Sequence, residues 1–258
     1  MTTSLITGAT SGIGAAFARR LAADSHRLVL VARDEDRLAR TAAELRARYN
    51  ASVEVLPADL AEDHGIAAVE ARLSDPARPV QVLVNSAGFG NRGVFLDVPV
   101  AEEVRMLKVH CEAVLRLTAA AVPAMRDRRH GFVINVASIA AFMPRGTYGA
   151  SKAWVVRFTE GIAHELQGSG IRFLVLCPGL TRTEFHDRAG MDASRLPSWA
   201  WLNPNKVVAI ALRDLARGRT LSVPDPRYKL AAALARHTPT PLFSAVSTRT
   251  TRTYDPKP

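Results

Sequence analysis

The feature that most constrains the fold of this chain is a regular alternation between short apolar runs and longer segments of helical period. The apolar runs are rich in β-branched residues and predict strands near residues 3–7, 27–32, 52–57, 80–85, 131–137, 171–176 and 220–223. The longer segments predict helices, among them 34–49, 100–127 and 148–167. Strands that alternate with helices favour a parallel sheet. We therefore expect one α/β domain over residues 1–258, a doubly wound parallel sheet with helices on both faces.

The composition narrows the class of protein. Apolar residues make up 48% of the 258 residues, yet no run approaches the roughly 18 apolar residues of a membrane span. The N-terminus lacks the pattern of a secretory signal, so we expect a cytoplasmic protein. Cys111 and Cys177 have no metal-ligand spacing. The sequence thus predicts no metal site.

The net charge of +10 suggests an anionic partner. The candidates are a phosphorylated cofactor, an acidic carrier protein, an anionic lipid surface or nucleic acid. No zinc pattern, helix-turn-helix signature or interleaved aromatic and basic strand supports nucleic acid, so we expect none. A basic, partly amphipathic stretch at 227–247 could instead lie on a membrane surface, although a solvated surface is the simpler interpretation and no membrane partner is expected.

Two C-terminal segments lack regular periodicity. Residues 184–202 form an irregular stretch that contains Phe185, Met191, Trp199 and Trp201. A segment of this length inside a compact domain is more often a functional lid than a passive connection. The tail, about 238–258, is rich in Thr, Pro and Arg, and we expect it to be loosely ordered.

A glycine-rich turn, TGATSGIG at residues 7–14, directly follows the first predicted strand and opens the first predicted helix. Gly8 can make a tight turn, Gly12 can let the backbone approach a pyrophosphate, and Gly14 can bring the helix close to the sheet. The N–H groups at the helix start would then face the negative charge. Glycines alone would also suit a flexible turn, but their position at the first strand-to-helix crossing favours the dinucleotide site of a Rossmann fold.

The end of the second predicted strand bears on the choice of dinucleotide. An acidic residue there would bond the adenosine ribose of NAD, whereas an arginine can hold the 2′-phosphate of NADP. Here Arg33 follows the run LVLVA, which favours NADP over NAD. Asp34 comes next, and it either faces the ribose or caps the following helix.

Further motifs follow in a fixed order: NSAG at 85–88, INVAS at 134–138, the pair Tyr148 and Lys152, and CPG at 177–179. With the glycine-rich turn, this ordered set resembles the short-chain dehydrogenase/reductase superfamily, from residue 3 to about residue 185. The resemblance implies an NAD(P)-dependent oxidoreductase. The C-terminal third is similar to the family only in general layout.

The resemblance implies that Tyr148 is the general acid and base of hydride transfer, that Lys152 lowers its pKa and binds the nicotinamide ribose, and that Ser138 holds the substrate oxygen. The chemistry is reasonable, because a free tyrosine has a pKa of about 10 and a nearby positive charge stabilises its phenolate. Lys152 lies four residues after Tyr148, on the same helical face. Taken alone, such a pair would more often be a surface contact.

The resemblance also implies a set of cofactor-binding residues. They are Gly8, Thr10, Ser11, Gly12, Ile13, Gly14, Arg33, Asp59, Leu60, Asn85, Ala87, Gly88, Tyr148, Lys152, Pro178, Gly179, Thr181 and Thr183. Among them, Asp59 either lies beside the adenine or caps a helix, and Asn85 either steadies the sheet and the cofactor loop or is a turn residue at the end of a strand. Thr183 resembles the residue that bonds the nicotinamide carboxamide, with Thr181 as an alternative.

Two positions depart from the family pattern. His110 stands where the family commonly has an asparagine that interrupts the helix and holds a water linking Lys152 to solvent. An imidazole could hold this water in a different geometry, or His110 could be a structural residue without a catalytic role. The link from Ser138 to Tyr148 is shorter than usual, which should cut back one wall of the substrate pocket.

We therefore expect an NADP-dependent oxidoreductase acting on a carbonyl or secondary alcohol of a largely apolar small molecule, which Phe89, Met143, Phe185, Trp199 and Trp201 could line. A 3-oxoacyl-carrier-protein reductase is an alternative within the same class, and a protein that binds NADP without catalysis is an alternative outside it. The resemblance further implies a homodimer or homotetramer formed through the helices at 100–127 and 148–167.

Overall fold

The computed structural model describes residues 1–91, 93, 95–185 and 197–237. Seven strands form one parallel sheet in the order β3-β2-β1-β4-β5-β6-β7. They are β1 (Thr3–Thr7), β2 (Arg27–Ala32), β3 (Val53–Pro57), β4 (Val82–Asn85), β5 (Gly131–Val136), β6 (Ile171–Leu176) and β7 (Leu221–Ser222). All seven predicted strands are present, and the doubly wound α/β fold is confirmed.

Helices connect the strands in the predicted alternation. They are α1 (Gly12–Ala23), α2 (Glu35–Tyr49), α3 (Asp63–Leu73), α4 (Val100–Leu107), α5 (Ala113–Asp127), α6 (Gly146–Glu165), α8 (Pro204–Ala216) and α9 (Pro226–His237). Short 3₁₀ turns lie at Phe95–Asp97, Ile139–Phe142 and Ser198–Ala200.

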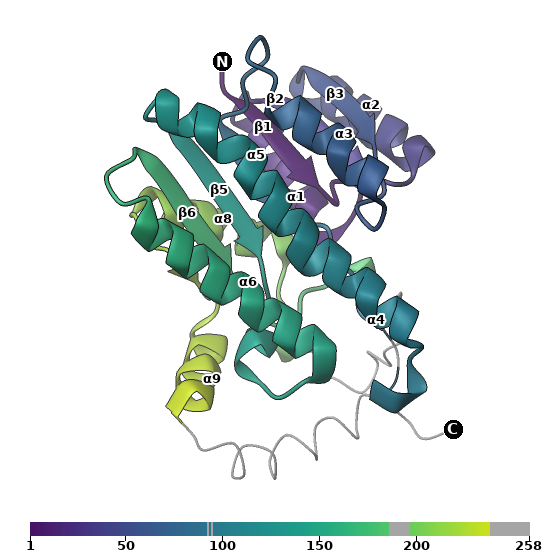
Figure 1. Cartoon of the computed structure of the whole chain (residues 1–258), viewed down its shortest axis with the longest axis vertical. Helices are drawn as coiled ribbons and strands as arrows, with labels where there is room; N and C mark the ends of the chain where they lie inside the picture. Colours follow the sequence, from purple (N-terminus) through teal and green to yellow (C-terminus); the bar gives the residue numbers. More distant parts are fainter. Residues whose placement is uncertain (92, 94, 186–196, 238–258) are drawn as a thin grey trace.

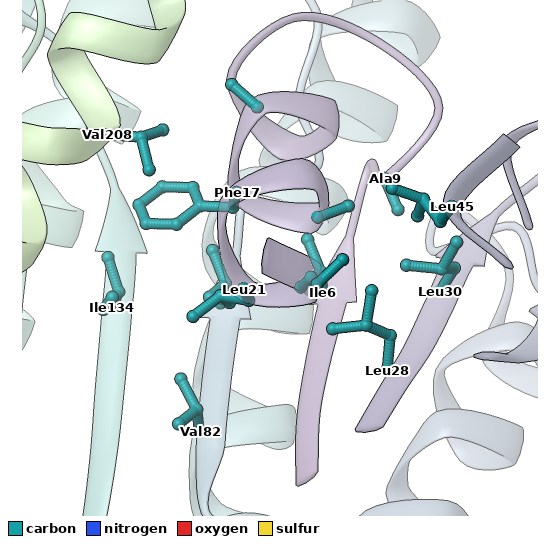
Figure 2. Packing of buried hydrophobic residues seen from close by; sticks show 14 of the residues in the cluster. Ile6, Ala9, Phe17, Leu21, Leu28, Leu30, Leu45, Val82, Ile134 and Val208 are labelled. Carbon is teal, nitrogen blue, oxygen red and sulfur yellow. The ribbon is translucent and has the colours of Figure 1, made fainter. Parts of the chain in front are cut away.

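The sheet separates two helical layers. Figure 1 shows α3, α5 and α6 in front of the strands, with α1 and α8 behind them. The front layer buries Leu117 of α5 and Ile66 of α3 against the sheet. Behind the sheet, Phe17 of α1 lies between Ile134 of β5 and Val208 of α8 (Figure 2). Both faces of each central strand are therefore buried, which explains why these strands are continuous apolar runs in the sequence.

The strand order reverses between β1 and β4. β2 and β3 extend the sheet on one side of this pair, and β5, β6 and β7 extend it on the other. In open α/β sheets, ligands bind in the crevice outside the carboxyl ends of the strands at such a switch point. The fold thus locates the candidate site at the loops that follow β1 and β4.

The helix predicted over 100–127 is present, but it is not α-helical throughout. Residues Lys108–Glu112 form a π-helical turn between α4 and α5. Such a turn inserts an extra residue into an α-helix and is frequent at functional sites. The pattern of apolar residues does not reveal the insertion, because the turn depends on packing against the sheet loops and α6.

The irregular segment 184–202 is described only at its two ends. A parallel bridge pairs Thr181 with Leu202, and two backbone hydrogen bonds flank it. The segment therefore begins and ends at the same point of the fold. Residues 186–196, with Met191, and the tail 238–258 lie outside the described part of the chain, as does the end of the basic stretch 227–247 beyond residue 237.

Candidate active site

A cavity of about 410 Å³ opens at the carboxyl edge of the sheet. Its walls come from the loops after β1 to β6, so it crosses the switch point between β1 and β4. It brings together most of the residues predicted from the sequence. These are Gly8, Thr10, Ser11, Gly12, Ile13, Arg33, Asp59, Leu60, Ala87, Gly88, Ser138, Tyr148, Lys152, Pro178, Gly179, Thr181 and Thr183.

The glycine-rich turn forms a tight cradle at the start of α1. Gly8 has a φ of +65°, and a Cβ there would lie 2.9 Å from the Cα of Ala87. Gly12 has a φ of +54°, and a Cβ there would lie 3.0 Å from a side-chain methyl of Thr183. There is thus no room for side chains at Gly8 and Gly12, at the N-terminus of α1. A pyrophosphate needs such a turn, because it must approach the backbone N–H groups at the start of the helix. The turn therefore fits a dinucleotide.

Gly14 does not line the cavity. A Cβ at Gly14 would overlap the carbonyl oxygen of Gly8, so the absent side chain lets α1 pack directly on the turn. This contact matches the role predicted for the third glycine, which is to hold helix and strand together.

Asn85, at the end of β4, also lies outside the cavity wall. Its buried amide donates hydrogen bonds to Asn135 Oδ1 (2.9 Å) and Thr118 Oγ1 (3.4 Å). Asn135 in turn donates to Thr159 of α6 (3.0 Å). Asn85 thus joins the strands to the front helices, which agrees with its predicted role of steadying the sheet. Its side chain turns into the protein interior and does not line the cavity that would hold the cofactor.

Charged side chains lie where the second and third strands end. Arg33 is more than half exposed and lies 3.8 Å from Asp59. Asp34 accepts a hydrogen bond from the backbone N–H of Arg37 (2.9 Å), so it caps α2. Asp59 accepts one from the N–H of Ala61 (2.9 Å) in the loop before α3 and also lines the cavity. The N-cap of α3 is Glu62, so Asp59 does not cap this helix, and its place in the cavity wall agrees with the other predicted role.

Arg37 is a cavity residue that the motifs did not reveal. It lies one helical turn after Arg33, and this spacing is the sequence signal that could have found it. Its guanidinium donates to the carbonyl of Thr10 in the glycine-rich turn (3.2 Å).

Ser138, Tyr148 and Lys152 meet at the opposite end of the cavity. Ser138 follows β5, where its hydroxyl also accepts a hydrogen bond from the N–H of Ala140 (3.1 Å). The first turn of α6 brings Tyr148 into hydrogen-bond contact with Ser138. Lys152, which is buried, donates to the carbonyl of Val136 (3.3 Å) and lies 5.8 Å from the Tyr148 ring centre.

Burial dominates the titration of these groups. Burial raises the pKa of Tyr148, opposed by its hydrogen bond with Ser138 and by the positive charge of Arg145. Burial also lowers the pKa of Lys152 to about 8, opposed by the thiols of Cys111 and Cys177. The lowered tyrosine pKa expected from the Tyr148–Lys152 pair is therefore not present with these protein groups alone, because desolvation outweighs the charges around the ring.

His110 lies in the π-helical turn, fully buried behind Tyr148, with the two ring centres 5.6 Å apart. Its Nε2 accepts the backbone N–H of Phe89 (3.2 Å), so Nδ1 carries the proton and donates to Ser151 Oγ (2.9 Å). Ser151 donates to the carbonyl of Tyr148 (2.8 Å). Burial and the charge of Lys152 hold the pKa of His110 well below its usual range. His110 is thus a neutral ring whose two nitrogens both bond protein atoms.

The two threonines after β6 both line the cavity. Thr181 donates to the carbonyl of Gly179 (3.0 Å) and is buried. Thr183 accepts the N–H of Phe185 (3.3 Å) and packs its methyl group against Gly12. Thr183 therefore lies nearer the glycine-rich turn.

Phe89, Met143 and Phe185 form apolar walls near Tyr148, and the ring centre of Phe185 lies 5.8 Å from that of Tyr148. The two tryptophans, which were candidates for the same wall, do not line the described cavity. Trp199 is 66% exposed and stacks on Arg227 of α9, and Trp201 is not part of the described cavity wall.

Within residues 1–91, 93, 95–185 and 197–237, no helix is long and apolar enough to cross a membrane. The same described residues contain no group of three or more His, Cys, Asp or Glu side chains that could hold a metal ion.

Comparison with known proteins gives the same family throughout. The family model for short chain dehydrogenases matches residues 2–193. The ketoacyl reductase HetN of Nostoc sp. is 30% identical over 229 residues, which cover 86% of this chain and 77% of HetN.

Solved structures extend the likeness to nearly the whole chain. A short-chain dehydrogenase from Sphingobium yanoikuyae in complex with NADPH is 35% identical, with a TM-score of 0.84 over 97% of this chain and 94% of that one. A bulky-bulky ketone specific alcohol dehydrogenase from Comamonas testosteroni is 30% identical, with a TM-score of 0.79 over 97% and 93%.

A relative from Burkholderia phymatum in complex with NAD is 27% identical, with a TM-score of 0.79 over 90% of this chain and 92% of that one. The relatives thus include both NADP and NAD complexes. By the family model, the relatives and the fold, the chain belongs to the short chain dehydrogenase family of NAD(P)-dependent oxidoreductases.

Proposed function

We propose that this protein is an NADP-dependent oxidoreductase that acts on the carbonyl or secondary alcohol of a largely apolar molecule. One observation carries the proposal. Ser138, Tyr148 and Lys152 lie at one end of a cavity whose other end holds a glycine-rich cradle and two arginines. The bound nicotinamide supplies the hydride, or accepts it in the reverse direction, and the chain has to supply the proton chemistry.

Tyr148 is the proposed proton donor in the direction of reduction. A carbonyl oxygen that accepts a hydrogen bond from Ser138 would lie within reach of the tyrosine hydroxyl, since the two hydroxyls are themselves in contact. As the substrate carbon receives hydride, negative charge grows on this oxygen, and the hydroxyl proton of Tyr148 passes to it. In the direction of oxidation, the phenolate of Tyr148 takes the proton back.

Lys152 has the proposed role of stabilising the phenolate. Its ammonium group is a buried cation close to the tyrosine ring, and charges interact more strongly there than in water. Burial brings the pKa of Lys152 to about 8, so the amine is still mostly protonated at neutral pH, and an anionic neighbour would raise that pKa again. Formation of the phenolate would therefore favour the protonated lysine, so the two groups support each other's charge.

The preference for NADP rests on the adenosine end of the cavity. Arg33 and Arg37 both line it, and a guanidinium group is the kind of donor that a 2′-phosphate requires. Asp34, the residue best placed to bond the ribose of NAD, instead caps α2. The complex of the Sphingobium relative with NADPH favours the same choice, while the NAD complex of the Burkholderia relative shows that the family also uses NAD.

The proposed substrate is apolar because the cavity beside Tyr148 is walled by Phe89, Met143 and Phe185. The Comamonas relative, a bulky-bulky ketone specific alcohol dehydrogenase, agrees with a substrate of this class. The name of HetN, a ketoacyl reductase, favours a 3-oxoacyl substrate as the second candidate. An acyl group carried by an acidic protein would also suit the net charge of +10.

His110 has the proposed role of a positioning residue. Its two hydrogen bonds connect the loop at Phe89 with Ser151, and through Ser151 with the backbone of Tyr148. Because both nitrogens are engaged and the ring stays neutral, it does not relay protons in this arrangement. It fixes Tyr148 relative to the loop instead.

We also propose that the chain forms a homo-oligomer through its front helices. Val100, Val104 and Leu107 lie on one stripe of α4 with more than a third of each side chain exposed, and Trp154 of α6 is similarly exposed. α4 and α6 are in contact with each other. Sedimentation that gave a monomer at micromolar concentration would contradict this proposal.

The function is tested by fluorescence titration of NADPH and NADH, followed by assay of a panel of carbonyl compounds. Tight NADPH binding that is weakened in Arg33→Ala, with turnover that is lost in Tyr148→Phe, is the expected result. NADPH binding without turnover on any carbonyl would favour the alternative of a protein that binds NADP without catalysis.

A further inference from the structure

The ion pair between Arg37 and Glu184 joins two distant parts of the chain at the edge of the cavity. Arg37 Nη1 donates to Glu184 Oε2 (3.0 Å), and Arg37 Nη2 donates to Glu184 Oε1 (2.8 Å). This is the two-pronged geometry that matches a planar guanidinium to a carboxylate. The contact raises the pKa of Arg37, through the hydrogen bond first and the negative charge next. Glu184 is thus a well-formed partner for Arg37.

The pair lies above the glycine-rich turn. Arg37 Nη2 also donates to the carbonyl of Thr10 (3.2 Å), and Thr183, the residue before Glu184, packs against Gly12. Arg37 lines the same cavity end as Arg33. The Glu184 carboxylate therefore lies close to the place where the phosphates of a bound dinucleotide would bind.

The two arginines at this end differ in how their acidic partners are held. Asp59, the partner of Arg33, is bonded to the N–H of Ala61 and also pairs with Arg105 (3.3 Å). The distance from Arg33 to Asp59 is 3.8 Å, at the limit of an ion pair. Arg37, by contrast, donates hydrogen bonds from both terminal nitrogens of its guanidinium group to Glu184. A phosphate that used the full fork of Arg37 would have to displace Glu184.

We propose that Glu184 competes with the adenosine 2′-phosphate of NADP for Arg37, and so sets how strongly the protein prefers NADP over NAD. The inference rests on the proposed function, because it needs a 2′-phosphate at this end of the cavity. NAD carries a hydroxyl in place of this phosphate, so it leaves the Arg37–Glu184 pair intact. Glu184 thereby reduces the affinity for NADP without reducing that for NAD.

The size of the effect follows from the exposure of the pair. The side chains of Arg37 and Glu184 are 28% and 49% exposed. Ion pairs at such positions change an equilibrium by about fivefold at most. Removal of the Glu184 charge should therefore strengthen the binding of a 2′-phosphorylated ligand by about three- to fivefold.

The test uses ligands that bind only at the adenosine end, so that it does not depend on catalysis. Isothermal titration calorimetry would measure adenosine 2′,5′-bisphosphate and adenosine 5′-phosphate against wild type, Glu184→Gln, Arg37→Ala and the double variant. Glu44→Gln is the matched control, since it removes the same charge from an exposed position of α2 about two helical turns beyond Arg37 that does not line the cavity. Comparison of the double variant with the two single variants shows how much of the change in affinity caused by Glu184→Gln requires Arg37.

The expected result is that Glu184→Gln strengthens binding of the bisphosphate about three- to fivefold and leaves that of the monophosphate unchanged. The gain should disappear when Arg37 is replaced, and Glu44→Gln should show none. Equal gains for both ligands, a gain that persists without Arg37, or no gain at all would overturn the inference. Equal affinity of the wild type for NADPH and NADH would instead contradict the NADP preference of the proposed function, while the calorimetry would still decide the role of Glu184.

Discussion

At the adenosine end of the cavity the charged side chains lie close to solvent, whereas at the reaction end Lys152 and His110 are enclosed. Arg33 is 57% exposed, but Lys152 is only 5% exposed and His110 is fully buried. Water screens the charges of the first group and leaves those of the second unscreened. Substitutions at the reaction end should therefore have large effects on activity or stability that do not depend on salt. Substitutions at the adenosine end should have small effects on cofactor binding that decrease as the salt concentration rises.

The largest effect should come from the enclosed end. We expect Tyr148→Phe to lower kcat by about 10²–10⁴-fold, because a positioned proton donor contributes this much. The affinity for NADPH, measured by fluorescence titration, should remain near that of the wild type, since the cradle at Gly8 and Gly12 is intact. A variant that kept half of the wild-type kcat would refute the assignment of Tyr148.

A change at the cradle itself should act on folding as well as binding. In Gly14→Ala the new methyl group would overlap the carbonyl oxygen of Gly8. The resulting shift of α1 should cost about 1–3 kcal/mol in the free energy of unfolding, as overpacking does elsewhere. Urea denaturation would measure this cost. Gly161→Ala is the control, because a Cβ at Gly161 of α6 meets nothing within 4 Å; equal destabilisation by both substitutions would contradict the explanation.

The exposed end should give a smaller effect. Arg33→Ala should weaken NADPH binding by about tenfold, the loss of one charge-assisted hydrogen bond, and leave NADH binding unchanged. Because Arg33 lies at the surface, the difference between wild type and variant should shrink as the salt concentration rises. If Arg33→Ala weakened the binding of NADPH and NADH equally, Arg33 would contact a part of the cofactor that both molecules share, and the preference for NADP would not depend on it.

The pH dependence of stability is a further test of the enclosed end. Burial lowers the pKa of His110 in the folded protein, so below about pH 6.5 the unfolded chain takes up a proton that the folded chain does not. Stability should therefore fall as the pH falls from 7 to 5, by at most about 1.4 kcal/mol per pH unit for one such group.

Thermal denaturation of wild type and His110→Gln would measure stability over this pH range. The slope of stability against pH should be smaller in the variant than in the wild type. His26 has a pKa that is also lowered by burial, so part of the slope should remain. The exposed His64→Gln is the control. If His110→Gln had the same slope as wild type, the neutral state of His110 would be wrong.

The two ends also differ in how far the sequence predicted them. The strands and the glycine-rich turn were found because their signals are local, in the form of apolar runs and adjacent glycines. Ser138, Tyr148 and Lys152 were found because motifs in a fixed order resemble a known family. Their meeting at one cavity follows from the parallel strands, whose carboxyl ends lie at the same edge.

The features that were missed depend on contacts between distant residues. Glu184 lies 147 residues from Arg37, so nothing near either residue predicted the pair. The π-helical turn at His110 and the inward direction of Asn85 are likewise set by packing. The tryptophans were assigned to the pocket by residue type, which does not give the direction of a side chain.

The measurement that tests the central claim most directly is deuterium transfer from NADPH carrying two deuterium atoms at C4 of the nicotinamide. The protein would be incubated with an apolar ketone, and the alcohol product analysed by mass spectrometry. We predict one deuterium on the carbinol carbon with wild type and almost no product with Tyr148→Phe. NADPH binding without deuterated alcohol from any ketone, or equal product from Tyr148→Phe, would contradict the account.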